Sequence, residues 1–202
     1  MNVILATRNP SKAKQINGLF EGSPVLLQSL DDVGVVGDAV EDGTTLNENA
    51  MKKVLFAYKA LGGNAWVMAD DTGFFISALH GAPGIYAARW AGETATTKEI
   101  TDHTLHALIG ASDRSAKFET VVAIMSPDGQ EYFFSGAVEG HILEAERVPP
   151  QPKMPYSGIF MPNASDLVWA QMSVEFENTI SHRGIAFGKA REFLEAQMQQ
   201  GR

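Results

Sequence analysis

Apolar residues along the chain follow two patterns, one of short runs and one of helical spacing. The run at 3–7 (VILAT) predicts a β-strand, and the stretch 65–75 (AWVMADDTGFF) opens with a strand that we expect to end at Asp70 and Asp71. A helical stripe begins after Thr45 and predicts an amphipathic helix that a Gly-Gly pair terminates. The apolar positions of this stripe are Leu46, Ala50, Val54, Tyr58 and Leu61.

The second half of the chain adds further helices and strands. Helical spacing predicts a helix over 97–110, and two β-rich runs around a Pro-Asp-Gly turn at 127–129 predict a hairpin. Segment 148–162 holds five of the nine prolines, so it predicts a long irregular loop of a kind that is often functional. A last helix begins after Ser181. Together these elements predict an α/β protein with a hairpin-rich second half, arranged as two lobes with a central cleft.

Composition and charge narrow the class of protein. The chain has 202 residues and a net charge of −8, a field that repels a nucleic-acid backbone, so we expect no nucleic acid polymer as partner. No apolar run approaches the roughly 18–20 residues that a membrane span needs, and the N-terminus does not resemble a signal peptide. The chain has no cysteine, which excludes disulfides and thiolate catalysis and agrees with a reducing cytoplasm.

A cationic turn connects the first strand to the first helix. In ATRNPSK, Asn9 is a suitable N-cap and Pro10 suits the first helical position, while Arg8, Lys12 and Lys14 place positive charge at the helix start. Cations at a helix N-terminus oppose the macrodipole, so stability alone does not favour them. The turn is therefore either a set of solvated cations or an anion site that combines free helix N–H groups with positive side chains.

Two further features carry candidate chemistry. Adjacent strand residues face opposite sides, so we expect one of Asp70 and Asp71 to reach a ligand and the other to pair or to cap an Asx turn. Glu48 has capping-box spacing from Thr45, whereas Glu41 has no such structural role. A second cationic helix start, ISHRG, carries His182 and Arg183. Phosphate-binding cations, carboxylates for a divalent metal and a base for water are what nucleoside triphosphate hydrolysis needs.

At this point the sequence resembles the inosine triphosphate pyrophosphatase family of non-canonical purine NTP pyrophosphatases. The matching stretches are ILATRNPSKAKQI, EDGTTLNENAMKK, ADDTGFFISALHGAPGIYAARWAG, FSGAVEGHI, GIFMP and ISHRGIAF, which together extend over roughly residues 1–195. The resemblance implies one domain over residues 1–202, with an elongated mixed β-sheet flanked by helices. It implies a Mg²⁺-dependent enzyme, typically a cytoplasmic homodimer, that converts ITP, dITP or XTP to the monophosphate and pyrophosphate and so cleanses the nucleotide pool.

The resemblance also implies roles for individual residues. Asp71 matches the general base and a metal ligand, and Glu41 matches a second metal ligand. Thr72 matches a substrate contact, and His182 and Arg183 match residues that read a 6-keto oxygen of the base. The triphosphate would be wrapped by Thr7, Arg8, Asn9, Pro10, Ser11 and Lys12, and the further candidate substrate contacts are Lys53, Arg89 and Tyr156.

The chain departs from the family pattern near the implied base pocket. Tyr156 remains at the second aromatic position, but Met154 replaces the stacking aromatic residue, Pro155 a glycine and Ser157 an aspartate. Glu177 stands where the family has a lysine. Base–aromatic stacking contributes about 1–3 kcal/mol, so these changes bear on base preference. Three outcomes stay open: ITP-like substrates, a different or modified nucleotide, or a non-catalytic nucleotide-binding protein.

Overall fold

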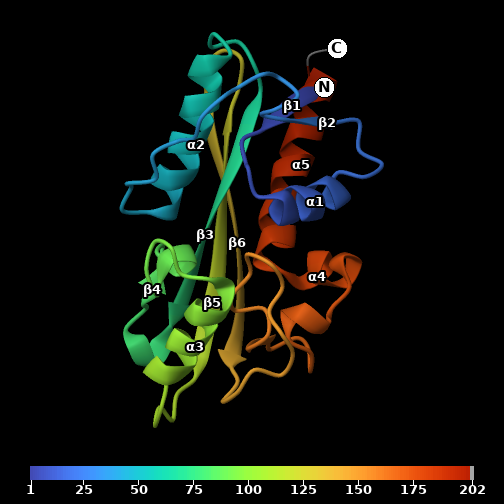
Figure 1. The fold of residues 1–202 in the computed structure, drawn as a ribbon. Helices are drawn as coiled ribbons and strands as arrows, with labels where there is room; N and C mark the ends of the chain where they lie inside the picture. Colours follow the sequence, from blue (N-terminus) through green and yellow to red (C-terminus); the bar gives the residue numbers. More distant parts are fainter. Residues whose placement is uncertain (201–202) are drawn as a thin grey trace. The chain divides into compact units, whose positions relative to one another are not determined.

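The computed structural model describes residues 1–200, in which strands and helices alternate (Figure 1). Three short 3₁₀ segments, at Ser77–Leu79, Ala87–Arg89 and Trp169–Gln171, join longer elements. The strands are β1 (Asn2–Leu5), β2 (Leu26–Ser29), β3 (Val67–Ile76), β4 (Pro83–Gly84), β5 (Ser115–Met125), β6 (Glu131–Ile142) and β7 (Phe160–Pro162). The helices are α1 (Pro10–Leu19), α2 (Leu46–Ala60), α3 (Thr97–Ala107), α4 (Val174–Ile180) and α5 (His182–Gln200).

The strands form one mixed sheet. Its order is β2-β1-β3-β5-β6-β7, and β4 pairs with β3 outside this path. Strand β1 is parallel to both β2 and β3, whereas β4 is antiparallel to β3 and β7 is antiparallel to β6. The parallel pairs are joined by helical crossovers, and β5 and β6 are joined by a short turn, as predicted. A mixed sheet flanked by helices confirms the expected α/β class.

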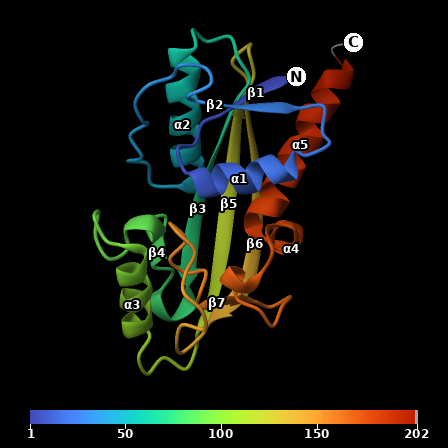
Figure 2. The ribbon, with the colours of Figure 1, turned by 45° about the vertical axis from the view of Figure 1, so that its right-hand side comes forward.

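The chain divides into two compact units, and three strands contribute to both. Unit 1 contains 1–71, 120–136 and the chain from His182, and unit 2 contains 72–119 and 137–181. In unit 1, helices α1 and α5 pack against each other, and α2 lies on the opposite side of the strands (Figures 1 and 2). The core beneath α1 and α5 is closed by side chains from both helices and from the strands, including Ile16, Met68, Val122, Phe187 and Leu194.

Unit 2 has a core built on aromatic rings. Phe74 stacks on Phe118 with ring centroids 4.2 Å apart, and Tyr156 lies 4.3 Å from Phe74. Phe160 packs edge-on against Phe118 at 4.9 Å. The Tyr156 hydroxyl donates a hydrogen bond of 2.7 Å to the carbonyl oxygen of Ala87, so the buried polar end of this ring is paired. Tyr156 thereby attaches the proline-rich loop to the aromatic core of unit 2.

One strand boundary was wrong in the sequence-based prediction. Strand β3 does not end at Asp70 and Asp71 but continues to Ile76, so neither acid caps an Asx turn. The two aspartates are only 1% and 7% exposed, and they lie in the middle of a strand whose second half buries Phe74 and Ile76. The prediction failed because an acidic pair normally marks the end of a buried run, whereas here the acids are compensated by charges from neighbouring helices.

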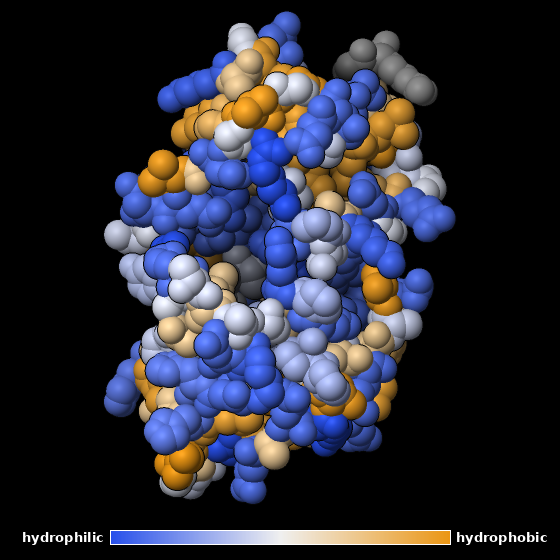
Figure 3. Space-filling model, in the orientation of Figure 1, coloured by the Kyte–Doolittle hydropathy of each residue, from blue (hydrophilic) through white to orange (hydrophobic). Residues whose placement is uncertain are grey.

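Polar side chains dominate the surface. Figure 3 shows hydrophilic residues over most of the face drawn, with hydrophobic residues in smaller groups between them. Within residues 1–200, no helix combines the length and the apolar character that crossing a membrane requires.

The paired hydroxyl of Tyr156 gives a test of the unit 2 core. We expect Tyr156→Phe to lower the free energy of unfolding by about 1–2 kcal/mol, because it leaves the buried carbonyl of Ala87 without its donor. Denaturant unfolding measures this loss. Tyr86→Phe is the matched control, since Tyr86 is half exposed and its change should cost little. Equal stability of Tyr156→Phe and the parent protein would contradict the assignment.

Candidate functional site

Unit 1 brings together charged side chains from four elements that are far apart in the sequence. Lys12 comes from α1, Lys53 from α2, the aspartate pair from β3 and Arg183 from α5. Because successive strand residues face opposite sides, Asp70 reaches α1 and α5 while Asp71 reaches α2. The alternation expected from the sequence is therefore present, although in the middle of the strand.

Asp70 lies between two cations. Its Oδ2 is 3.0 Å from the Lys12 ammonium nitrogen and 3.7 Å from Nε of Arg183. Burial alone would raise the pKa of Asp70, but the charges of Lys12, Arg183 and Lys53 outweigh it and hold that pKa well below its usual range. Asp70 is therefore an ionised, buried counter-charge, which is the pairing role expected for one member of the aspartate pair.

Gln15 completes this network, and the sequence analysis missed it. The side-chain oxygen of Gln15 accepts a hydrogen bond of 2.5 Å from Nη1 of Arg183. Gln15 lies one turn after Lys12 on α1 and is buried, so the same helix face presents both residues to the strands. The spacing of three residues between Lys12 and Gln15, which places both on one helix face, was the available signal.

Lys53 occupies the other side of β3. Its ammonium nitrogen is 2.9 Å from the backbone oxygen of Asp70, 3.0 Å from Oδ1 of Asp71 and 2.9 Å from Oε2 of Glu41. Burial would lower the pKa of Lys53, but the surrounding carboxylates raise it above its ordinary value. Lys53 thus remains charged and joins the two carboxylates that were predicted to bind a metal.

The carboxylate of Asp71 has one occupied and one unoccupied oxygen. Oδ1 contacts Lys53, whereas Oδ2 is buried and has no hydrogen-bond partner among the residues that the structure describes. Burial raises the pKa of Asp71 above its ordinary value, despite the opposing charges of Lys53 and Lys12. A desolvated carboxylate oxygen without a donor is suited to accept a proton or to coordinate a cation.

Asp71 and Glu41 fit a magnesium ion. Mg²⁺ is usually bound by one or two carboxylates, with water and substrate phosphate oxygens completing the octahedron. Both carboxylates lie close together because each contacts the ammonium of Lys53. Oδ2 of Asp71 has no hydrogen-bond donor among the described residues and could bind the metal. Across residues 1–200 there is no cluster of three or more metal-ligating side chains, so substrate oxygens would have to supply the other ligands.

The first helix differs from the predicted anion site in one respect. Oδ1 of Asn9 accepts hydrogen bonds from the backbone N–H groups of Ser11 (3.0 Å) and Lys12 (3.3 Å), and the N–H of Ala13 bonds to the Asn9 carbonyl. The backbone N–H of Asn9 in turn bonds to Oγ1 of Thr7. The prediction of free helix N–H groups was therefore wrong, because the N-cap already satisfies them, and the positive charge toward β3 comes from the side chain of Lys12.

Arg8 points to a loop of its own unit. Its guanidinium contacts Asp31 at 2.6 Å and Asp38 at 3.1 Å, and it donates to the carbonyl oxygens of Val35 at 2.7 Å and Gly37 at 3.0 Å. The phosphate contacts predicted for Arg8 and for the rest of the turn, Thr7, Asn9, Pro10 and Ser11, stay predictions.

The last helix supplies one buried cation and one buried imidazole. His182 and Arg183 occupy its first turn and are 3% and 4% exposed. Burial, and secondarily the charge of Arg183, keep the pKa of His182 well below its ordinary value, so the imidazole is neutral near pH 7. The expectation of two cationic groups at this helix start was therefore wrong for His182.

The remaining candidates belong to unit 2. Thr72 directly follows Asp71 on β3, and Arg89 lies 3.6 Å from Glu93 and over the ring of Tyr86. Tyr156 is buried in the aromatic core described above. The substrate contacts predicted for Thr72, Arg89 and Tyr156 stay predictions.

The positions that depart from the family pattern also lie in unit 2. Ser157 is buried, donates to the Met154 carbonyl at 2.7 Å and accepts from the N–H of Gln151 at 2.8 Å. Thr101 donates to the Pro155 carbonyl at 2.5 Å, and Glu177 is a buried carboxylate on α4. These contacts hold the turn at 151–157 in place, so Met154, Pro155 and Ser157 have hydrogen-bond partners within their own unit.

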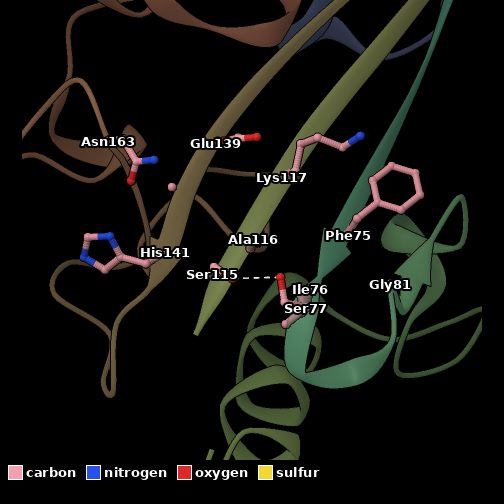
Figure 4. Close-up of a pocket in the computed structure, with 11 residues that line it drawn as sticks. Phe75, Ile76, Ser77, Gly81, Ser115, Ala116, Lys117, Glu139, His141 and Asn163 are labelled. Carbon is pink, nitrogen blue, oxygen red and sulfur yellow. Dashed lines mark hydrogen bonds between the residues drawn. The ribbon is translucent and has the colours of Figure 1, made fainter. Parts of the chain in front are cut away.

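A separate pocket of about 540 Å³ lies on the sheet of unit 2 (Figure 4). Ser77 and Ser115 hydrogen-bond to each other at 2.7 Å, and the ammonium of Lys117 pairs with Glu119 at 2.8 Å. His141 contributes a ring from β6. None of the candidate site residues lines this pocket, and its charged lysine already has a counter-ion.

Two carboxylates joined by a lysine, beside further buried cations on a mixed sheet, define a class of site suited to phosphoanhydride chemistry. The sequence profile of the Ham1 family matches residues 3–193, and the chain belongs to that family. This confirms the resemblance inferred from the sequence motifs.

Two relatives and one solved structure support this family membership. The dITP/XTP pyrophosphatase of Thermoanaerobacter pseudethanolicus is 37% identical over 196 residues, which cover 96% of each chain. The enzyme of the same name from Leuconostoc mesenteroides is 39% identical over 190 residues, 92% of each chain. The Ham1 protein of Staphylococcus aureus has a TM-score of 0.83 at 32% identity and covers 98% of this chain and 100% of its own.

The two adjacent aspartates should differ in their effect on stability. We expect Asp70→Asn to lower the free energy of unfolding by about 3–5 kcal/mol, because it leaves the buried Arg183 and the partly buried Lys12 without their counter-charge. Asp71→Asn should cost much less, because burial already disfavours the charged form of Asp71. Denaturant unfolding of both variants gives the comparison, and equal losses would contradict the division of roles.

The neutral state of His182 predicts a pH dependence of stability. The unfolded chain takes up a proton at His182 near its ordinary pKa, whereas the folded protein does not, so this residue makes stability fall as pH drops below about 6.5. The maximum slope from one such group is about 1.4 kcal/mol per pH unit. The free energy of unfolding of the parent and of His182→Gln, measured between pH 8 and 5, gives this slope. The free energy should decline less steeply with falling pH in the variant. Parallel curves would show that His182 is protonated in the folded state.

Proposed function

We propose that the protein hydrolyses deaminated purine nucleoside triphosphates, namely ITP, dITP and XTP, to the nucleoside monophosphate and pyrophosphate. The observation that carries this proposal is the meeting of Asp71 and Glu41 at Lys53, with the Lys12–Asp70–Arg183 network on the other side of the same strand. The names of the relatives, dITP/XTP pyrophosphatases that match over nearly the whole chain, support the same activity.

Lys12 and Lys53 hold the polyphosphate in this proposal. Each is buried or partly buried, so its charge is less screened than on an open surface. Their present carboxylate partners keep them ordered before substrate binds, which lowers the entropic cost of forming the phosphate contacts. Substrate binding then exchanges part of the carboxylate contact for contact with phosphate oxygens.

Asp71 acts as the general base. Its buried Oδ2 takes a proton from a water molecule that attacks the α-phosphorus, and pyrophosphate leaves with the electron pair of the broken P–O bond. Without metal, burial raises the pKa of Asp71 above its ordinary value, which favours proton acceptance by this carboxylate. A magnesium ion held by Asp71 and Glu41 would neutralise phosphate charge and polarise the reacting phosphoryl group when bound.

Base selection rests on two residues in the first turn of α5. His182 and Arg183 can donate to a 6-keto oxygen, whereas adenine offers an amino group at that position and leaves those donors unpaired. The changed residues of unit 2, Met154, Ser157 and Glu177, make a shifted base preference the second candidate. Their substitution near the implied base pocket is the observation that favours it.

A nucleotide panel tests the proposed function. Purified protein with Mg²⁺ should release pyrophosphate, and no orthophosphate, from ITP, dITP or XTP faster than from ATP or GTP, and a chelator should stop release. Equal rates on ATP would contradict the proposed base selection, and fastest turnover of another modified nucleotide would support the second candidate. Stabilisation by nucleotides in a thermal-shift assay without any product would favour a binding protein.

Asp71→Asn tests the proposed chemistry. The variant should keep its fold and its affinity for nucleotide but lose at least about 10²–10⁴-fold in kcat, because it removes the base. Circular dichroism and nucleotide binding serve as controls. Full activity of this variant would show that Asp71 is not the base.

The assembly and location proposed for this protein rest on the family resemblance. We propose a homodimer that acts in the cytoplasm on small-molecule nucleotides. Light scattering of the purified protein tests the dimer, and a monomeric mass at working concentrations would contradict it.

A further inference from the structure

The position of Glu41 depends on a loop that has little support from regular structure. Residues 31–43 contain no helix or strand, and several of their side chains are exposed, including Val36, Asp38 and Val40. Yet Glu41 must stay near Asp71 if both are to hold one cation. The loop therefore needs fixed points on each side of Glu41.

One fixed point follows Glu41 directly. The buried N–H of Gly43 donates to Oδ1 of Asn49 at 2.8 Å, and Asp42 pairs with Lys52. Asn49 and Lys52 are both on α2, the helix that also carries Lys53. The C-terminal side of the loop is thus attached to the same helix as the lysine that contacts Glu41.

The other fixed point is Arg8. Its guanidinium binds the carboxylates of Asp31 and Asp38 and the carbonyl oxygens of Val35 and Gly37, so that all three of its nitrogens contact the loop. Val35 is buried, which places this part of the loop against the body of unit 1. The contacts end at Asp38, three residues before Glu41.

We propose that Arg8 is a positioning residue for Glu41 and not a ligand of the triphosphate. A guanidinium is suited to this task because its planar fork can bind several acceptors at once, which a lysine ammonium in the same place cannot do to the same extent. The side chain of Arg8 is 31% exposed, so the contacts add little to global stability. Their effect is to order the segment that carries the metal-binding carboxylate. This inference rests on the proposed metal site and adds a residue to its support.

The first measurement needs no activity. Hydrogen exchange of backbone amides within 31–43 should be faster in Arg8→Gln than in the parent, while exchange in β1 and α5 is unchanged. Asp38→Asn should give the same pattern of exchange, because it removes a loop carboxylate that pairs with Arg8. Unchanged exchange in 31–43 would overturn the proposal, whether or not the protein is a pyrophosphatase.

The second measurement separates metal from nucleotide binding. Titration of the substrate-free protein with Mg²⁺ or Mn²⁺, followed by calorimetry, should give a Kd raised roughly 10- to 100-fold in Arg8→Gln, the range seen when residues that orient a metal ligand are removed. The Kd of Arg8→Lys for the metal should lie between those of the parent protein and Arg8→Gln. At saturating metal, the KM for ITP should stay close to that of the parent.

Arg191→Gln is the matched control. Arg191 is 37% exposed, donates to the carbonyl of Leu19 at 2.7 Å and lies near Glu195, so it also anchors a segment of unit 1 but is not attached to the loop. It should leave metal affinity and loop exchange unchanged. A raised KM for ITP at saturating metal in Arg8→Gln, with parental metal affinity, would instead show that Arg8 binds phosphate.

Discussion

The buried carboxylate of Asp70 is the charge on which the arrangement of unit 1 depends. It sits in the middle of β3 and is 1% exposed, and Lys12 and Arg183 reach it from two different helices. Without it the buried Arg183 and the partly buried Lys12 would lack a counter-charge, and an uncompensated charge in a protein interior is costly. The pairing therefore fixes α1 and α5 against the same strand and keeps two positive side chains in place.

The next residue, Asp71, has the opposite role. It faces α2, where one of its oxygens meets Lys53 and the other has no donor among the described residues. The pKa of Asp70 is lowered by its cations, while burial raises that of Asp71. The two neighbouring aspartates therefore differ: Asp70 pairs with two cations of the fold, whereas Asp71 keeps one oxygen without a donor among the described residues. The alternation of a β-strand is what gives them different surroundings.

Local sequence rules predicted much of the fold. Asn9 and Thr45 cap α1 and α2 as expected, and the Pro-Asp-Gly turn joins β5 and β6. The local rules failed where tertiary contacts decide how far an element extends. Strand β3 continues through its two acids because helices distant in sequence neutralise them, and no local pattern reveals that.

The candidate site was predicted to a similar extent. Residue types identified Lys12 and Arg183, and the family resemblance added Lys53. The structure brings these three side chains to the two faces of one strand. The charge state of His182 and the loop contacts of Arg8 could not be predicted, because both depend on burial and on partners more than twenty residues away. A charged residue in a motif can therefore support the fold as well as bind the ligand.

The most direct test of this account is a crystal structure with Mn²⁺ and a non-hydrolysable ITP analogue. Anomalous scattering locates the metal independently of the protein atoms. We expect Mn²⁺ bound to Asp71 and Glu41, phosphate oxygens on Lys12 and Lys53, and Asp70 still paired with Arg183 and not on the metal. A metal bound elsewhere, with Asp71 remaining on Lys53 and distant from the α-phosphate, would contradict it.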